Sequence, residues 1–134
     1  MKPDIVAKCE NLFALAQKRG ERSTSYDSKR GEDEMAGCGT KNDRTHHTFQ
    51  SGTFTIKATQ NEWARWDPSS DTKETRYELE IRRGSKIVFL AQRNGARHED
   101  FFSGDEERFQ RSRDTEPSSW KVSRGRMPVK YLKE

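Results

Sequence analysis

Histidine, glutamate and arginine together can cleave a phosphodiester without a metal, and all three occur in this sequence. Such ribonucleases pair a general base with a general acid, commonly two histidines or a glutamate and a histidine, while Arg or Lys stabilises the phosphorane. Residues of these types are His46, His47, His98, Glu99, Arg93 and Arg97. No spacing selects the three histidines as a set. A small metal-independent ribonuclease using His46 or His47 with His98 is therefore an alternative, and the sequence favours a protein without catalytic activity.

Metal-binding motifs are not indicated. Zinc ligands commonly occur in close pairs, but Cys38 is well separated from His46, and His46 and His47 would point to opposite faces of a strand. Glu78 and Glu80 share one face of an expected strand, as carboxylates of a magnesium site would. Alternating acids are nevertheless typical of the solvated face of any antiparallel sheet. We therefore expect no metal and no cofactor.

Basic residues interleaved with aromatic residues give the strongest indication of a partner. The segment 118–133 holds Trp120 and Tyr131 among several Lys and Arg residues and contains no acid. Cations at hairpin tips can reach phosphates, and exposed rings can stack on unpaired bases. We predict a small basic non-enzymatic protein that contacts nucleic acid or a nucleoprotein complex. The predicted contact residues are Arg82, Arg83, Lys86, Trp120, Lys121, Arg124, Arg126 and Lys130.

The aromatic residues of this segment have a second interpretation. A turn at Arg124-Gly125 separates apolar residues that keep one parity on each side, which is the pattern of a core face. These residues are Trp120, Val122, Met127, Val129 and Tyr131. On this interpretation the rings are buried and only the cations remain exposed.

A protein partner is a further alternative. Trp63 and Trp66 lie close together in the chain, and tryptophan and arginine are favoured at the centres of protein interfaces. A sheet with exposed hairpins and a long polar loop would suit a protein-interaction module or an inhibitor of the phage or mobile-element type. On this hypothesis Trp63 and Trp66 bind the partner.

The composition is that of a small folded domain with a limited core. The chain has 134 residues, 29% hydrophobic and 36% charged, with a net charge of +4. That excess permits nucleic-acid binding without requiring it. No apolar run reaches the length of a membrane span, and the N-terminus shows no signal-peptide pattern. We expect one cytoplasmic domain, residues 1–134, which is a monomer or small homo-oligomer, does not bind membranes and keeps Cys9 and Cys38 as free thiols.

An amphipathic helix is predicted over residues 4–19. Its apolar residues recur at spacings of three and four and form one stripe. They are Ile5, Val6, Cys9, Leu12, Phe13 and Ala16. Asp4 can cap the first turn, and Gly20 can end the helix. Residues from about 20 to 48 contain few large apolar side chains, so we expect a long polar loop there.

Alternation of apolar and polar residues predicts strands from about residue 49 to 132. The alternating apolar sets are Phe54, Ile56 and Ala58, and Tyr77, Leu79 and Ile81. A two-residue turn at Gly84-Ser85 would place Ile81 opposite Val88. We therefore predict an α+β fold, in which the N-terminal amphipathic helix packs on one face of a four- to six-stranded antiparallel sheet.

Overall fold

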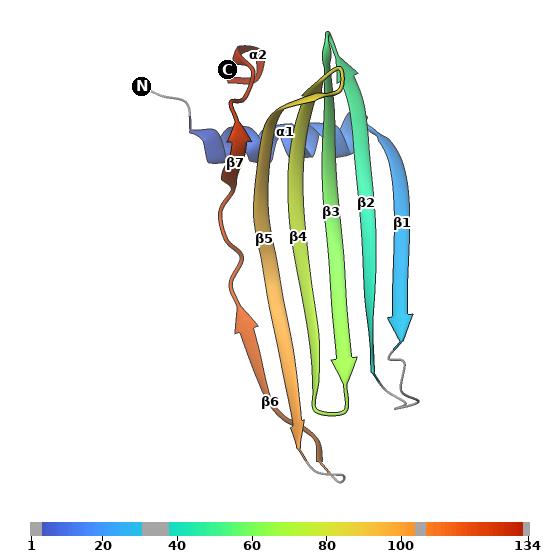
Figure 1. Cartoon of the computed structure of the whole chain (residues 1–134). Helices are drawn as coiled ribbons and strands as arrows, with labels where there is room; N and C mark the ends of the chain where they lie inside the picture. Colours follow the sequence, from blue (N-terminus) through green and yellow to red (C-terminus); the bar gives the residue numbers. More distant parts are fainter. Residues whose placement is uncertain (1–3, 31–37, 104–106, 133–134) are drawn as a thin grey trace.

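The computed structural model describes residues 4–30, 38–103 and 107–132 of the chain (Figure 1). A long helix is followed by a set of strands and a short final helix. The elements are α1 (Ile5–Arg19), β1 (Glu21–Arg30), β2 (Gly39–Ser51), β3 (Phe54–Asp67), β4 (Ser70–Arg83), β5 (Lys86–Ser103), β6 (Glu107–Thr115), β7 (Lys121–Gly125) and α2 (Val129–Leu132). Within these described ranges, neither helix is long and apolar enough to cross a membrane.

The strands form one antiparallel sheet in which neighbours along the chain pair in turn. The order is β1-β2-β3-β4-β5-β6, and β7 also pairs with β5. Figure 1 shows α1 lying across one face of the sheet, toward the end that carries the β2–β3 and β4–β5 turns. The predicted α+β arrangement of a helix on an antiparallel sheet is confirmed. Over the described residues the sheet has seven strands instead of the predicted four to six.

The polar loop predicted over residues 20–48 is largely a strand hairpin. Residues Glu21–Arg30 pair in continuous register with residues 39–48, and residues 31–37 lie outside the described part of the chain. Strand pairing satisfies backbone N–H and C=O groups whatever the side chains are. An edge strand exposed on both faces, as β1 is, needs no apolar alternation. Hydrophobic periodicity therefore could not detect it.

The core lies between α1 and the sheet face that it covers. At the start of α1, the Val6 N–H donates to Asp4 Oδ1 at 3.0 Å, and at its end the Gly20 N–H donates to the Ala16 carbonyl at 2.7 Å. Buried residues alternate along β3, β4 and β5, as the sequence pattern predicts for β3 and β4. The core between α1 and these strands comprises Cys9, Leu12, Phe13, Ala16, Ile56, Ala58, Leu79, Ile81, Phe89 and Ala91.

A bulge changes the predicted register of the β4–β5 hairpin. Ile81 pairs with Phe89 and not with Val88, because the register shifts between Ile81 and Arg82. A bulge adds one residue to one strand of a pair, which a two-residue turn alone does not predict. Phe89 consequently faces the helix, and Leu90 faces the opposite side of the sheet.

The two cysteines differ in accessibility. Both are free thiols, and Cys9 is buried on the side of α1 that faces the sheet, whereas Cys38 is partly exposed. Burial raises the pKa of the Cys9 thiol to about 11, and the Glu10 carboxylate adds to the effect. Because the thiolate is the reactive form, we expect native protein at pH 8 to react quickly with DTNB at Cys38 only. Both thiols should react in denaturant, and fast reaction of both in native protein would contradict the burial of Cys9.

Candidate functional site

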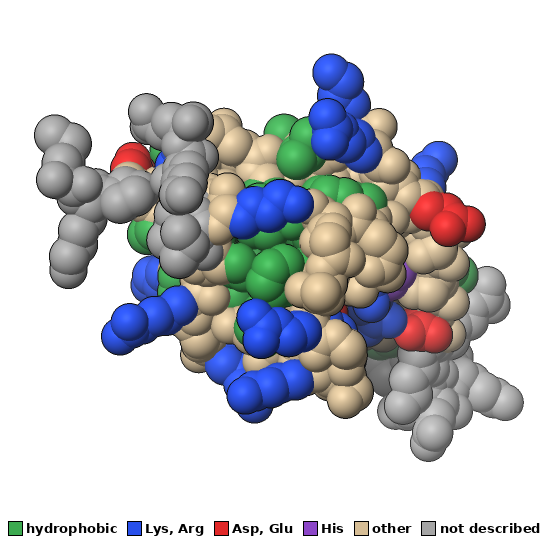
Figure 2. All heavy atoms as spheres, turned by 90° about the horizontal axis from the view of Figure 1, so that it is seen from above, with side chains coloured by type: hydrophobic (Ala, Val, Ile, Leu, Met, Phe, Trp, Pro, Cys, Tyr) green, Lys and Arg blue, Asp and Glu red, His purple; other side chains and the backbone are tan. Residues whose placement is uncertain are grey.

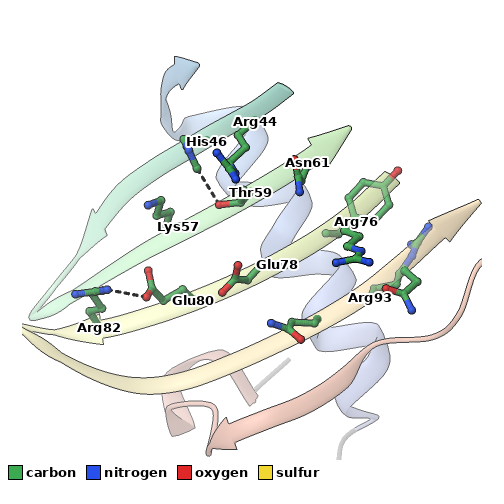
Figure 3. A pocket seen from close by; sticks show the side chains of 13 residues that line it. Arg44, His46, Lys57, Thr59, Asn61, Arg76, Glu78, Glu80, Arg82 and Arg93 are labelled. Atoms are coloured by element: carbon green, nitrogen blue, oxygen red, sulfur yellow. Dashed lines mark hydrogen bonds and ion pairs between the residues drawn. The ribbon is translucent and has the colours of Figure 1, made fainter. Parts of the chain in front are cut away.

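A polar hollow lies on the open face, defined here as the sheet face opposite α1. It encloses about 400 Å³ and is lined by side chains from β2, β3, β4 and β5 (Figure 3). Side chains alternate along a strand, so the residues between the buried core positions point to this face. Most of the lining side chains are charged or carry amide or hydroxyl groups. The open face therefore offers hydrogen-bonding groups instead of a second apolar core.

The antiparallel register arranges these side chains in rows across the strands. The central row consists of His46, Thr59, Glu78 and Gln92. The flanking rows are Arg44, Asn61, Arg76 and Asn94 on one side, and Thr48, Lys57, Glu80 and Leu90 on the other. Adjacent strands lie about 4.8 Å apart, so the backbones of His46 and Glu78 are separated by roughly 10 Å, with Thr59 between them.

β7 extends two of these rows with cations. Lys121 pairs with Gln92, and Arg124 pairs with Leu90. Residues directly opposite each other on paired strands point to the same side of the sheet. Lys121 and Arg124 therefore join the open face, although they are far from Arg44 and Lys57 in the chain.

His46 is held at one end of the central row. Its Nδ1 lies 2.9 Å from Thr59 Oγ1. Partial burial lowers the pKa of His46, and the positive charges of Lys57 and Arg44 lower it further. The ring is consequently neutral for the most part at pH 7, with Nε2 as the nitrogen that Thr59 does not engage.

Glu78 occupies the middle of the hollow. Burial raises the pKa of its carboxyl, the neighbouring Glu80 carboxylate raises it further, and Lys57 acts in the opposite direction. Within the described residues the Glu78 carboxyl has no hydrogen-bond or ion-pair partner. Glu80 differs, because Arg82 contacts it at 2.9 Å. Burial and the adjacent negative charge therefore favour the protonated form of Glu78.

Two polar groups that line the hollow lack partners. Asn61 Oδ1 is buried there without a hydrogen bond to any described residue. Arg93 differs, because its guanidinium lies over the Tyr77 ring at 4.8 Å, and that ring packs against Phe13 on the α1 side of the sheet. Lys57 forms no ion pair among the described residues. Unsatisfied buried polar atoms are uncommon in folded proteins. The hollow thus presents donors and an acceptor that a polar ligand can satisfy.

The seven basic residues predicted from the sequence lie in three places. Arg82 lines the polar hollow, and Lys121 and Arg124 extend its rows. Lys86 lies at the tip of the β4–β5 hairpin. A separate apolar hollow of about 840 Å³ is bordered by the remaining three, Arg83, Arg126 and Lys130. Figure 2 shows this end of the molecule, where Lys and Arg side chains surround a group of hydrophobic ones.

Trp120 belongs to the core and not to the surface. Its side chain is buried, and its ring packs against Phe13 with 5.6 Å between centroids. The ring is therefore unable to stack on a base. The interpretation of the alternating residues as a core face is therefore correct for Trp120, which precedes β7. Val122, within β7, is exposed instead.

The other catalytic candidates from the sequence are not brought together. His47 follows His46 on β2 and so faces the α1 side of the sheet, opposite Ala58. His98 lies on the far half of β5, where its two ring nitrogens contact Asp100 at 2.8 Å and Asp114. Glu99 is paired with Arg97 at 3.0 Å. No common site of His47, His98 and Glu99 exists in this fold.

Trp63 and Trp66 do not share a surface. Both lie on β3 and are half-buried. Residues three apart on a strand point to opposite faces, so the two rings cannot bind one partner patch together. Trp63 lines a shallow pocket beside Lys73 and Thr75, and Trp66 does not.

The sequence analysis did not select Arg44, Lys57 and Arg76 as candidate site residues, and it did not connect His46 with Glu78. The segment that contains Arg44 and His46 was expected to be a loop, so no face could be assigned to it. The signal was present in the alternation of Arg44, His46 and Thr48, which matches the alternation of polar residues on β3. Only the register of β2 against β3 shows that these residues lie beside one another on the same face.

The comparisons with known proteins add no relative. No family model matches the chain, and neither a curated protein nor a solved structure is significantly similar to it. Within residues 4–30, 38–103 and 107–132, no group of three or more His, Cys, Asp or Glu side chains is placed to hold a metal ion. The chemistry of the open face is therefore the basis on which function can be inferred.

Proposed function

We propose that the protein binds nucleic acid across the open face of its sheet, with the phosphate backbone over the polar hollow. The observation that carries this proposal is the convergence of cations from β2, β3, β4 and β7 on one face. These cations are Arg44, Lys57, Arg76, Arg82, Lys121 and Arg124.

The charge balance of the hollow suits a polyanion. Its lining includes five Arg or Lys residues against two acids, Glu78 and Glu80. Two of these cations also have acidic partners outside the hollow, Arg44 with Asp27 at 3.2 Å and Arg76 with Glu74 at 2.6 Å. Arg82 already pairs with Glu80 at 2.9 Å, and burial and Glu80 raise the pKa of Glu78. Phosphates that replace weakly held counterions at such a face gain charge-assisted hydrogen bonds.

The size and polar lining of the hollow suit a single strand. A hollow of about 400 Å³ is in the range of small-ligand sites and accommodates a nucleotide, not a duplex. The amides of Asn61, Gln92 and Asn94 line it beside the cations. Amide groups can donate to and accept from the polar edges of a base that is not paired.

Neutralising two cations at opposite sides of this face is expected to weaken binding and its dependence on salt. The variant Arg44→Gln/Arg124→Gln removes one cation from β2 and one from β7. Each lost phosphate contact makes the negative slope of log affinity against log salt shallower by about one. The magnitude of the slope should therefore decrease by about two. Fluorescence anisotropy with labelled single-stranded RNA, single-stranded DNA and a duplex, over a salt series, measures both quantities.

A matched control carries the same change of net charge elsewhere. Lys18 and Arg19 lie in the last turn of α1, exposed to solvent. The variant Lys18→Gln/Arg19→Gln should leave the affinity and the salt slope close to those of the original protein. Equal losses in the two double variants would show that net charge alone drives binding, and the proposed interface would be wrong.

A further inference from the structure

We propose that the polar hollow is a ribonuclease site, in which His46 and Glu78 act as general base and general acid on a phosphodiester held above Thr59. This inference rests on the proposed binding of nucleic acid at the open face. It assigns the chemistry to a pair of residues from β2 and β4.

The position of the two side chains fits the transfer of two protons at one phosphate. His46 and Glu78 belong to the central row, and Thr59 lies between them on β3. Figure 3 shows both side chains on the same face, directed into the hollow. The gap of roughly 10 Å between their backbones leaves room for a phosphate and its ribose oxygens between the two functional groups. A base and an acid on opposite sides of phosphorus are what in-line displacement requires.

Thr59 and the neighbouring cations complete the arrangement. Thr59 Oγ1 engages His46 Nδ1 at 2.9 Å, which orients the ring and leaves Nε2 for the substrate. Lys57 and Arg76 lie in the rows on either side of Glu78, and Arg44 lies beside His46. Cations in these positions can stabilise the additional negative charge of the pentacoordinate phosphorane.

The reaction balances without a metal or a co-reactant. Nε2 of neutral His46 takes the proton of the ribose 2′-OH, and the 2′ oxygen forms a bond to phosphorus. The bond from phosphorus to the 5′ oxygen of the next nucleotide breaks, and the protonated Glu78 carboxyl donates its proton to that oxygen. The products are a 2′,3′-cyclic phosphate and a free 5′-hydroxyl, and exchange with water returns both residues to their starting forms.

The environments of the two groups agree with these roles. The pKa of His46 is lowered by partial burial, Lys57 and Arg44, while Ser23 on β1 brings no charge to the row. The pKa of Glu78 is raised by burial and Glu80, with Lys57 opposing. The rate should rise with pH as His46 loses its proton and fall as Glu78 ionises. The expected profile is therefore bell-shaped, with its maximum on the acid side of neutral pH.

The test compares cleavage with binding in the same variants. Wild-type protein should cut labelled single-stranded RNA in the presence of EDTA and leave a 2′,3′-cyclic phosphate. Glu78→Gln and His46→Gln should each lower the cleavage rate by about 10²–10⁴-fold. Both variants should keep their affinity for single-stranded DNA of the same sequence within about three-fold, because DNA lacks the 2′-OH nucleophile but retains the phosphates. Circular dichroism and thermal melting establish that each variant is folded.

Two control variants make the same chemical changes outside the hollow. His47→Gln alters the histidine next in sequence, which faces the α1 side of the sheet. Glu62→Gln alters an exposed glutamate on β3 that does not line the hollow. Both should cleave RNA at the wild-type rate. Loss of cleavage in these controls would overturn the assignment of the pair.

The outcomes separate this inference from the proposed function. Binding of RNA and DNA without cleavage by wild-type protein would overturn the ribonuclease inference and leave nucleic-acid binding standing. Neither binding nor cleavage would overturn both. Cleavage that survives in Glu78→Gln and His46→Gln would show that another site or a contaminating nuclease acts, and cleavage abolished by EDTA would overturn the metal-free mechanism.

Discussion

Replacing Phe89 by alanine is expected to lower the free energy of unfolding by about 3–5 kcal/mol, the range for truncation of a buried aromatic ring. Phe89 is fully buried on β5, opposite Ile81 and within the core beneath α1. Domains of this size have only about 5–15 kcal/mol of net stability. The variant should therefore lose a large part of it, as urea denaturation followed by circular dichroism can measure.

The adjacent residue provides a control for this prediction. Leu90 follows Phe89 in the chain but lies on the open face and is only partly buried. Leu90→Ala should cost less than half as much, because fewer contacts and less apolar area are lost. Equal losses at the two positions would contradict the register imposed by the bulge, which places Phe89 inside and Leu90 outside.

Replacing Gly125 by alanine is expected to destabilise the attachment of β7. Gly125 has φ of 70°, and a Cβ atom there would lie 2.0 Å from the carbonyl oxygen of Val88. The left-handed backbone alone costs about 1–3 kcal/mol for a residue with a side chain, and the contact with Val88 forces the backbone to move as well. The hydrogen bond from the Arg126 N–H to the same oxygen, at 3.2 Å, should be lost.

The change at Gly125 should also be visible in function. β7 carries Lys121 and Arg124 to the open face, so its displacement should weaken the proposed nucleic-acid binding together with thermal stability. Gly84→Ala is the matched control, since Gly84 has φ of 60° but no atom within 4 Å of the added Cβ. It should show the backbone cost without the clash and without weaker binding. Equal effects in the two variants would refute the close approach of Gly125 to Val88.

The two faces of the sheet differ in the side chains that they present. The face beneath α1 holds the apolar residues of β3, β4 and β5, and it supplies the stability. The same strands are then free to carry polar residues at the alternate positions, where His46, Thr59 and Glu78 line up across three strands. A substitution on the open face can therefore alter this row of polar side chains with little effect on the core.

Local pattern was sufficient for part of this fold. The helix was predictable because an apolar stripe with a spacing of three to four residues lies between Asp4 and Gly20, and both act as expected at its ends. The buried faces of β3 and β4 were predictable because apolar residues alternate there with polar ones, as at Ile56 and Ala58. The class of the fold follows from these two patterns, since each apolar face requires the other for burial.

The candidate site was only partly predictable. Arg82, Lys121 and Arg124 were selected from the sequence as cations near hairpins, and they do reach the open face. Trp120 was selected with them, but its ring packs in the core against Phe13. The alternative interpretation, in which Trp120 belongs to an apolar core face, predicted this position. A basic residue tolerates exposure in almost any fold, whereas the position of an aromatic ring depends on what packs against it.

The sequence by itself determined the helix, the apolar alternation of the central strands and the excess of positive charge, because each of these is a property of neighbouring residues. Tertiary structure alone decided that the polar residues 21–30 form a paired edge strand, that a bulge turns Phe89 inward, and that Arg124 meets the row of Lys57. These features depend on the register between segments far apart in the chain. Register is set by backbone hydrogen bonds and by packing of the whole sheet, and a shift of one residue moves every side chain to the other face.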